Sequence, residues 1–238
     1  MATARFRFFD ELNDFLPRAR RDKEFAAPCA RAATTKHMIE ALGVPHTEAG
    51  RVLVNGEAAD FGRLLEEGDA VLVYPHASAA QAGIRFVADA HVGGLARLLR
   101  MAGFDTLYDN GYQDEEIAAI AAHEARTVLT RDRELLKRRE LEQGCYLHAI
   151  RPEAQLRELC ARLELAPLVR PFTLCLHCNM PLRPVAKSDV LERLPESVRA
   201  SHDAFTACGA CGRVFWKGSH HKRMLAMLDG AIGLESSA

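Results

Sequence analysis

Residues 128–135 read VLTRDREL and join a predicted buried strand to the start of a helix. An acid, Asp132, stands at the junction between Arg131 and Arg133. Apolar and β-branched residues before the junction favour an extended strand, and an Asp in this position is commonly a helix N-cap. A charged residue at the end of a buried strand raises the question of whether other acids arrive at the same place.

The segments around this stretch alternate between strand and helix patterns. Strands are predicted at 84–89, 106–109, 126–130 and 145–150, and helices at 91–102, 114–124, 132–143 and 152–163. Strands that alternate with helices form βαβ units with right-handed crossovers. We therefore expect an α/β domain over residues 83–168, with a parallel sheet and helices on both of its faces.

Residues 1–77 carry a different pattern. Two strands are predicted near 4–9 and 23–29, then a helix that Thr35 opens and Gly43 ends, then strands near 51–56 and 69–75. This α+β order resembles the ubiquitin-like β-grasp family, which includes sulfur carriers that end in Gly-Gly. The last strand continues instead as HASAAQAG, and the small residues of 77–83 predict a linker. We expect this domain to dock a protein partner rather than to transfer sulfur.

Composition limits the kinds of partner. The 238 residues are 48% hydrophobic, which is enough for a buried core. Lys plus Arg number 31 and Asp plus Glu 32, a formal net charge of -1, so any attraction to nucleic acid must be local. We find no signal peptide and no apolar run of the ~20 residues that cross a bilayer. We expect a cytoplasmic protein without a membrane partner.

Four of the seven cysteines form two CxxC pairs. Cys175 and Cys178 make one pair, Cys208 and Cys211 make the other, and 29 residues separate the pairs. Two such turns supply the four thiolates of a closed structural Zn²⁺ site. The alternative, two redox pairs, is expected beside a thioredoxin-like βαβ start rather than in a Pro- and Gly-rich tail. Residues 169–238 are therefore predicted to be a zinc ribbon.

The remaining residues of this module have less specific patterns. Residues 182–206 are predicted to be an insert, and His177 to be a bystander. The other cysteines are Cys29, Cys145 and Cys160, and we expect them to be buried as small apolar groups.

Acids follow the predicted parallel strands at their carboxyl ends. Asp89 closes the first strand, Asp109 the second and Asp132 the third, and Asp114 begins the helix after the second strand. Ligands bind at this edge of an open α/β sheet. Each acid alone is readily explained as a helix cap, but several like charges at one edge favour a cation such as Mg²⁺ or Mn²⁺. A pair of such ions can drive phosphodiester cleavage.

Other α/β chemistries lack their residues. The chain has no GxxxxGK[ST] loop, no GxGxxG in the first βα turn and no GxSxG elbow. A haloacid-dehalogenase-like phosphatase needs an Asp where this chain has His91. Metal-dependent chemistry on phosphate remains, and Arg131 and Arg133 could then contact the phosphate.

A cluster of donors follows the second cysteine pair. Residues 216–223 read WKGSHHKR, and Ser219, His220 and Arg223 suit contacts with an RNA backbone. The alternative is structural: Trp216 packs on the zinc turns and Ser219 caps the last helix.

Several of these segments together resemble one known family. FVADAHVGGLARLLRMAGFDTLY, DEEIAAIA, TVLTRDREL, the cysteine pairs and FWKGSHHKRM look like the PIN-like ribonuclease family called the Mut-seven C-terminal RNase domain, from Ile84 to Leu228. Several of its members carry a ubiquitin-like domain in front. The resemblance implies a PIN-like fold, an RNA substrate and a Mg²⁺- or Mn²⁺-dependent ribonuclease.

The resemblance also implies which acids act. Asp89, Asp114 and Asp132 match the acids of the family's motifs, and Glu115 is an alternative to Asp114. PIN nucleases use three or four acids, and both Asp109 and Glu134 are candidates for the fourth. The competing hypothesis is a non-catalytic RNA-binding or adaptor protein with a ubiquitin-like recruitment domain.

Overall fold

A computed structural model describes residues 2–77 and 82–232. The chain divides into two compact units, one of residues 1–78 and 114–146, the other of residues 79–113 and 147–238. Residues 78–81 of the predicted linker lie outside the described residues.

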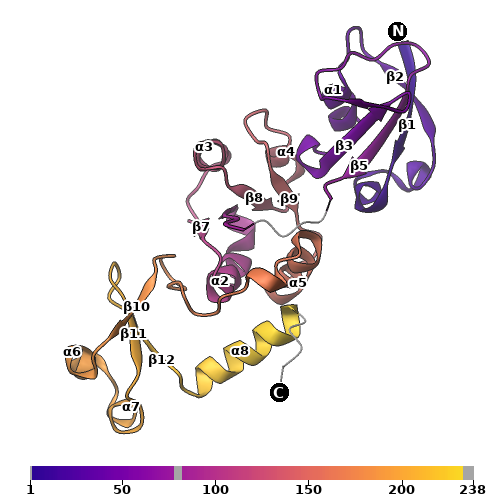
Figure 1. Ribbon diagram of the computed structural model, residues 1–238. Helices are drawn as coiled ribbons and strands as arrows, with labels where there is room; N and C mark the ends of the chain where they lie inside the picture. The colour runs from indigo at the N-terminus through magenta and orange to yellow at the C-terminus, as the bar shows by residue number, and fades with distance from the viewer. Residues whose placement is uncertain (1, 78–81, 233–238) are drawn as a thin grey trace. The chain divides into compact units, whose positions relative to one another are not determined.

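The first unit begins with the predicted β-grasp domain (Figure 1). Its sheet has the order β2-β1-β5-β3-β4, with the two central strands β1 and β5 parallel. The strands are β1 (Ala2–Phe8), β2 (Phe25–Cys29), β3 (Ala49–Val54), β4 (Glu57–Ala59) and β5 (Ala70–Pro75), and the helix is α1 (Thr35–Ala41). Short 3₁₀ turns lie at η1 (Asp10–Phe15), η2 (Arg18–Arg20) and η3 (His46–Glu48).

Alternation in the first strand builds the core of this domain. Phe6 and Phe8 point to one face and are buried, and Met38 and Ile39 of α1 complete the same cluster. Figure 1 shows α1 beside this sheet. The helix begins at Thr35, as predicted, and its N-cap is Thr34, whose side chain accepts a hydrogen bond from the His37 N–H at 3.2 Å.

The prediction of four strands missed β4. Asn55 and Gly56 both have positive φ, 54° and 86°, and this tight turn folds residues 57–59 back against β3. An Asn-Gly pair between extended segments is a strong hairpin signal. The turn was visible in the sequence, but only three residues follow it in the strand.

Two pairs of parallel strands follow the β-grasp domain along the chain. In the second unit β6 (Phe86–Ala88) pairs with β7 (Thr106–Tyr108), and in the first unit β8 (Thr127–Thr130) pairs with β9 (Gly144–Tyr146). Every residue of β6 and β8 is buried, as expected for strands covered on both faces. The associated helices are α2 (Gly93–Ala102), which follows the η4 turn (Ala90–Val92), α3 (Asp114–Glu124) and α5 (Pro152–Leu163).

The helix predicted at 132–143 is wrong in length, since α4 covers only Arg133–Leu136. The first domain supplies the reason. The hydroxyl of Thr47 donates to the carbonyl oxygen of Leu136 at 3.1 Å, and Nε2 of His46 lies 2.9 Å from the carbonyl oxygen of Leu141. A longer helix would bond the Leu136 carbonyl internally, so the contact with Thr47 competes with the helix, and tertiary structure overrides helix propensity here.

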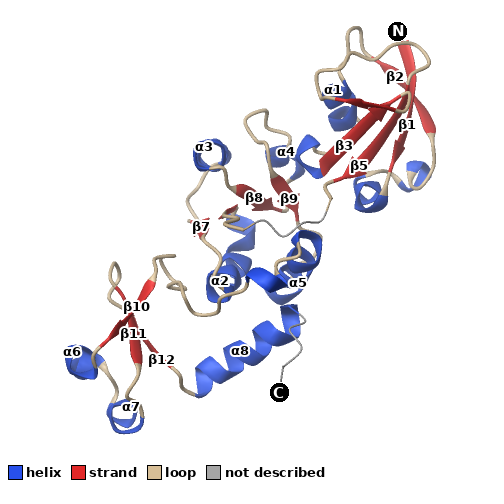
Figure 2. Cartoon of the chain, in the orientation of Figure 1, coloured by secondary structure: helices blue, strands red, loops and turns tan. Residues whose placement is uncertain are grey.

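The cysteine module in the second unit is an antiparallel sheet β10-β11-β12 followed by a long helix (Figure 2). After η5 (Ala166–Leu168) come β10 (Leu182–Val185), α6 (Lys187–Val190), η6 (Leu191–Arg193), α7 (Glu196–Ser201), β11 (Phe205–Cys208), β12 (Val214–Trp216) and α8 (Ser219–Ile232). The predicted insert at 182–206 is thus folded. Its small core contains Val190, Leu194 and Phe205, and Trp216 packs against that core.

Within the described part of the chain, none of the helices combines the length and the apolar character that a bilayer crossing requires.

Candidate functional site

The four predicted cysteine ligands lie together. Their sulfur atoms are all within 4.8 Å of one another; Cys178 lies 3.3 Å from Cys208, and Cys175 lies 3.6 Å from Cys211. A tetrahedral Zn²⁺ with Zn–S bonds of about 2.3 Å places its sulfurs about 3.8 Å apart, so the cluster has the size of a zinc site. Across the described residues it is the one group of three or more acidic, His or Cys ligands packed this closely.

Backbone N–H groups of the two turns favour thiolates at this centre. Arg213 donates from its backbone N–H and its side chain to the sulfur of Cys211, and these bonds lower the pKa of that thiol to about 6. Burial and the neighbouring sulfur of Cys208 raise the pKa of Cys178 to about 12. Four thiols so close cannot all ionise unless a cation offsets their charge, and Zn²⁺ is the cation that suits four sulfurs.

Two predicted acids follow strands of the second unit. Asp89 comes directly after β6 and is only 5% exposed, with its Oδ2 3.0 Å from Nδ1 of His91. Asp109 comes directly after β7 and is exposed, and its Oδ1 accepts a hydrogen bond from the backbone N–H of Gly111 at 2.8 Å. The neighbouring strands β6 and β7 thus each carry an acid at the carboxyl end, as the sequence predicted.

The other predicted acids belong to the first unit. Asp132 follows β8 and caps α4, with Oδ1 accepting from the backbone N–H of Glu134 at 2.8 Å. Asp114 is the exposed first residue of α3. Its neighbour Glu115 pairs with Arg138 at 2.9 Å, and its own backbone N–H together with that arginine lowers the pKa of Glu115. The convergence of Asp89 with Asp114 and Asp132 stays a prediction.

The two arginines beside Asp132 differ in their contacts. Nε of Arg131 is buried and has no hydrogen-bond partner within the described residues. Arg133 instead lies over the rings of Phe15 and Tyr146 and donates to the carbonyl oxygen of Phe15 at 3.3 Å. Nε of Arg131 is therefore a buried donor that no described group uses, whereas Arg133 is held by the first domain.

The donors after the second cysteine pair lie on one helix. Ser219 is the first residue of α8, and His220 and Arg223 follow on it; all three are exposed. Their contact with RNA stays a prediction.

Comparison with protein families gives two matches. Residues 84–228, more than half of the chain, match the model described as the Mut7-C RNAse domain. The chain belongs to the Mut7-C RNAse domain family. Residues 1–81 match the model described as Mut7-C ubiquitin, so the Mut7-C RNAse domain of this chain follows a ubiquitin-like domain.

Solved structures match over the first domain. The small archaeal modifier protein 1 of Haloferax volcanii is 23% identical, with 32% of this chain and 100% of that chain covered and a TM-score of 0.27. A putative molybdopterin converting factor, subunit 1, from Pyrococcus furiosus is 15% identical, with the same coverage and a TM-score of 0.27. A comparison with curated proteins finds no significant match.

Sequence reasoning missed Arg100, which joins the Mut7-C RNAse helix α2 to the first cysteine turn. Arg100 is only 5% exposed; its Nη1 donates to the carbonyl oxygen of His177 at 2.7 Å and its Nε to that of Thr106 at 2.8 Å. Burial lowers the pKa of this guanidinium, and the nearby Cys178 and Cys175 oppose that shift. His177 is therefore a backbone anchor. The sequence did hold a sign of this role, because Arg100 stands among the apolar residues of LARLLRMA (95–102) that α2 buries.

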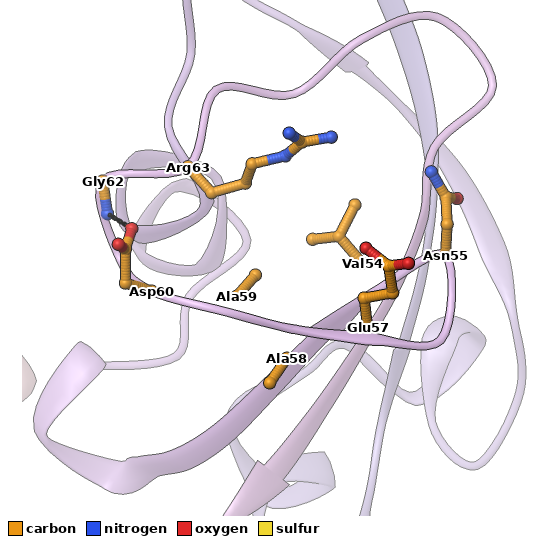
Figure 3. Close-up of a pocket in the computed structure, with 8 residues that line it drawn as sticks. All are labelled: Val54, Asn55, Glu57, Ala58, Ala59, Asp60, Gly62 and Arg63. Atoms are coloured by element: carbon orange, nitrogen blue, oxygen red, sulfur yellow. Dashed lines mark hydrogen bonds between the residues drawn. The ribbon is translucent and has the colours of Figure 1, made fainter.

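A pocket in the ubiquitin-like domain contains none of the predicted site residues (Figure 3). It lies beside the β3–β4 hairpin, and its charged side chains are Glu57, Asp60 and Arg63. Asp60 is used within its own turn, where Oδ1 accepts from the N–H of Gly62 at 2.9 Å. This pocket does not gather groups that would act together on a substrate.

Proposed function

We propose that this protein is a metal-dependent ribonuclease that hydrolyses RNA phosphodiester bonds. The observation that carries the proposal is the Mut7-C RNAse match over a segment in which acids follow successive strands of a parallel sheet. Asp89, Asp114 and Asp132 are the proposed ligands of Mg²⁺ or Mn²⁺. We further propose a PIN-like fold for residues 83–168 between the ubiquitin-like domain of 1–77 and a zinc ribbon of 169–238, and a cytoplasmic location.

The proposed ligands have suitable chemistry. Mg²⁺ and Mn²⁺ prefer oxygen ligands, and a buried carboxylate such as that of Asp89 is costly unless a cation or hydrogen-bond donor accompanies it. When bound, the ion supplies an activated water and stabilises the leaving oxygen. Oδ1 of Asp132 is used by the α4 cap, which fixes the orientation of this carboxylate.

Arg131 has the proposed role of a phosphate ligand. Its buried Nε lacks a hydrogen-bond partner in the described chain, and it directly precedes Asp132. A buried donor without a partner costs about 1–3 kcal/mol, and a change of the Arg131 rotamer that brings this group to a phosphate oxygen would remove that cost. Zn²⁺ at the cysteine centre has a structural role in this proposal, because four protein ligands close its shell.

The test uses short single-stranded RNAs of mixed sequence, each labelled at one end, with added Mn²⁺ or Mg²⁺. We expect cleavage by the wild type and a rate at least roughly 100-fold lower for Asp89→Asn and Asp132→Asn, because a lost metal ligand removes several kcal/mol of transition-state stabilisation. Asp203→Asn is the matched control, since this carboxylate is 94% exposed on the cysteine module.

Equal cleavage by Asp89→Asn and the wild type would contradict the proposal. Absence of cleavage by the wild type, together with RNA binding that does not respond to Mn²⁺, would favour the non-catalytic adaptor. A thermal melt with increasing Mn²⁺ separates the two further. The nuclease predicts stabilisation of the wild type but not of the Asp89 and Asp132 variants, whereas the adaptor predicts no difference.

A further inference from the structure

A basic pocket in the second unit lies outside all the predicted site residues. It has a volume of about 380 Å³ and is lined by helix α2, strand β7, the first cysteine turn and the segment that follows the second cysteine turn. Arg97 and Arg100 come from α2, Tyr108 from β7, His177 from the first cysteine turn, and Arg213 and Phe215 from the segment after the second turn. Segments far apart in the sequence therefore supply one cavity.

The charge of this pocket has one sign. Its lining includes three arginines and one histidine but no Asp or Glu. Arg97 and Arg213 are exposed, and neither forms an ion pair with a carboxylate in the described residues. The lining is therefore cationic, and the negative groups that act on Arg100, which include Cys178, Cys175 and Asp105, do not line the pocket.

The pocket is held in shape by buried contacts. Nε and Nη1 of Arg100 donate to the carbonyl oxygens of Thr106 and His177, respectively. These hydrogen bonds fix α2 against the first cysteine turn. Gly93 allows α2 to lie close to β7, since a Cβ there would meet the Tyr108 ring at 2.3 Å. Gly93, Arg97 and Arg100 are four and three residues apart, so one face of the helix lines the pocket.

We propose that this pocket binds the backbone of single-stranded RNA, with phosphates on Arg97 and Arg213 and a base against Tyr108 and Phe215. Guanidinium groups match phosphate oxygens in charge and geometry, and half-buried aromatic rings offer a stacking surface for bases of any sequence. Only the short turn η4 separates Asp89 from Gly93, the first residue of α2. RNA bound in the pocket would therefore lie beside a proposed metal ligand. The inference deepens the proposed ribonuclease function and rests on it for the identity of the ligand.

Binding is tested on the full zinc-loaded chain by fluorescence anisotropy of labelled oligouridine without Mg²⁺ or Mn²⁺. We expect Arg97→Gln combined with Arg213→Gln to weaken binding at least about ten-fold, since each replaces a charged hydrogen bond. The slope of log affinity against log salt should fall by about 1.4, because each phosphate contact on a single strand contributes about 0.7. Arg157→Gln with Arg183→Gln is the matched control, since both arginines are exposed elsewhere in the same unit.

Zinc content is measured for each variant, because Arg213 also contacts Cys211. Arg97→Gln alone provides a variant that does not touch a zinc ligand, and it should reduce the salt slope by about 0.7. If RNA affinity and its salt slope are unchanged in both variants that carry Arg97→Gln, the proposed RNA binding in this pocket is wrong, even if Asp89→Asn confirms the nuclease. Weakened binding by the pocket variants with no cleavage by the wild type would support the pocket and reject only the catalytic proposal.

Discussion

Arg133 lies over the ring of Phe15, with its Cζ 5.0 Å from the ring centroid, and its Nη1 donates to the Phe15 carbonyl oxygen at 3.3 Å. The same guanidinium is 5.4 Å from the centroid of Tyr146. These contacts connect the TRDR turn to the ubiquitin-like domain within one compact unit. A conformation fixed in this way indicates that Arg133 stabilises the contact between the two parts of that unit.

Replacing Arg133 should therefore destabilise the first unit. We expect Arg133→Ala to cost about 1–2 kcal/mol, from the lost cation–π contacts and the lost hydrogen bond. Arg133→Lys should recover part of this, because an ammonium keeps the charge but not the planar stacking. Urea unfolding measures the change, and Arg139→Ala is the control, since the Arg139 side chain is 89% exposed. An unaltered midpoint with weaker RNA binding would instead favour the predicted phosphate contact.

Glu48 makes a second contact between the ubiquitin-like domain and the rest of the first unit. It is 1% exposed, and its Oε1 accepts a hydrogen bond from the backbone N–H of Tyr146 in β9. We expect Glu48→Ala to cost about 1–3 kcal/mol, because it leaves a part-buried N–H without its acceptor. Glu48→Gln keeps an acceptor oxygen and should cost less. Thermal melts provide the measurement, and Glu57→Ala, at an exposed position of β4, should leave the midpoint unchanged.

The sequence predicted the elements whose signals are local. Helices α3 and α5 begin and end where the pattern predicted, because acids or a proline begin them and their apolar residues recur with helical spacing. The cysteine centre was predictable for a similar reason, since the two CxxC turns fix the ligands by spacing alone. Family resemblance predicted the two matched segments correctly.

The features that could not be predicted depend on distant partners. The carbonyl at the end of α4 bonds to Thr47, which lies 89 residues earlier in the chain. The role of Arg100 depends on a carbonyl group 77 residues later, and no local pattern indicates that pairing. The convergence of Asp89 with Asp114 and Asp132 stays a prediction, because it depends on tertiary structure rather than on spacing.

Arg100 should control zinc binding without being a ligand. Arg100→Ala leaves two carbonyl oxygens, those of Thr106 and His177, without their donor, and we expect a loss of about 3 kcal/mol or more. His177 lies between two of the proposed zinc ligands, Cys175 and Cys178, so the first cysteine turn should become less ordered and zinc affinity should fall by about 10–100-fold. Competition with a coloured chelator measures this affinity. Arg183→Ala is the control, and equal zinc affinity in Arg100→Ala would contradict the prediction.

Cys160 should make the stability of the protein fall in alkaline solution. Burial raises the pKa of its thiol to about 11, above the ordinary value of 9.0. The folded state therefore holds this proton more tightly than the unfolded state does. Its contribution to stability is complete below pH 9 and is lost as the pH rises from 9 to 11.

Cys160→Ala isolates this effect, since other groups titrate equally in both proteins and cancel in the difference. The free energy of unfolding of the wild type should exceed that of the variant by a constant amount below pH 9, because the variant leaves a small cavity. The difference should then shrink towards pH 11, as the unfolded wild-type thiol ionises. A difference that stays constant across this range would show that the thiol ionises equally in both states. Slow reaction of Cys160 with a thiol reagent in the native protein, and fast reaction after unfolding, provides an independent measurement because only the thiolate attacks.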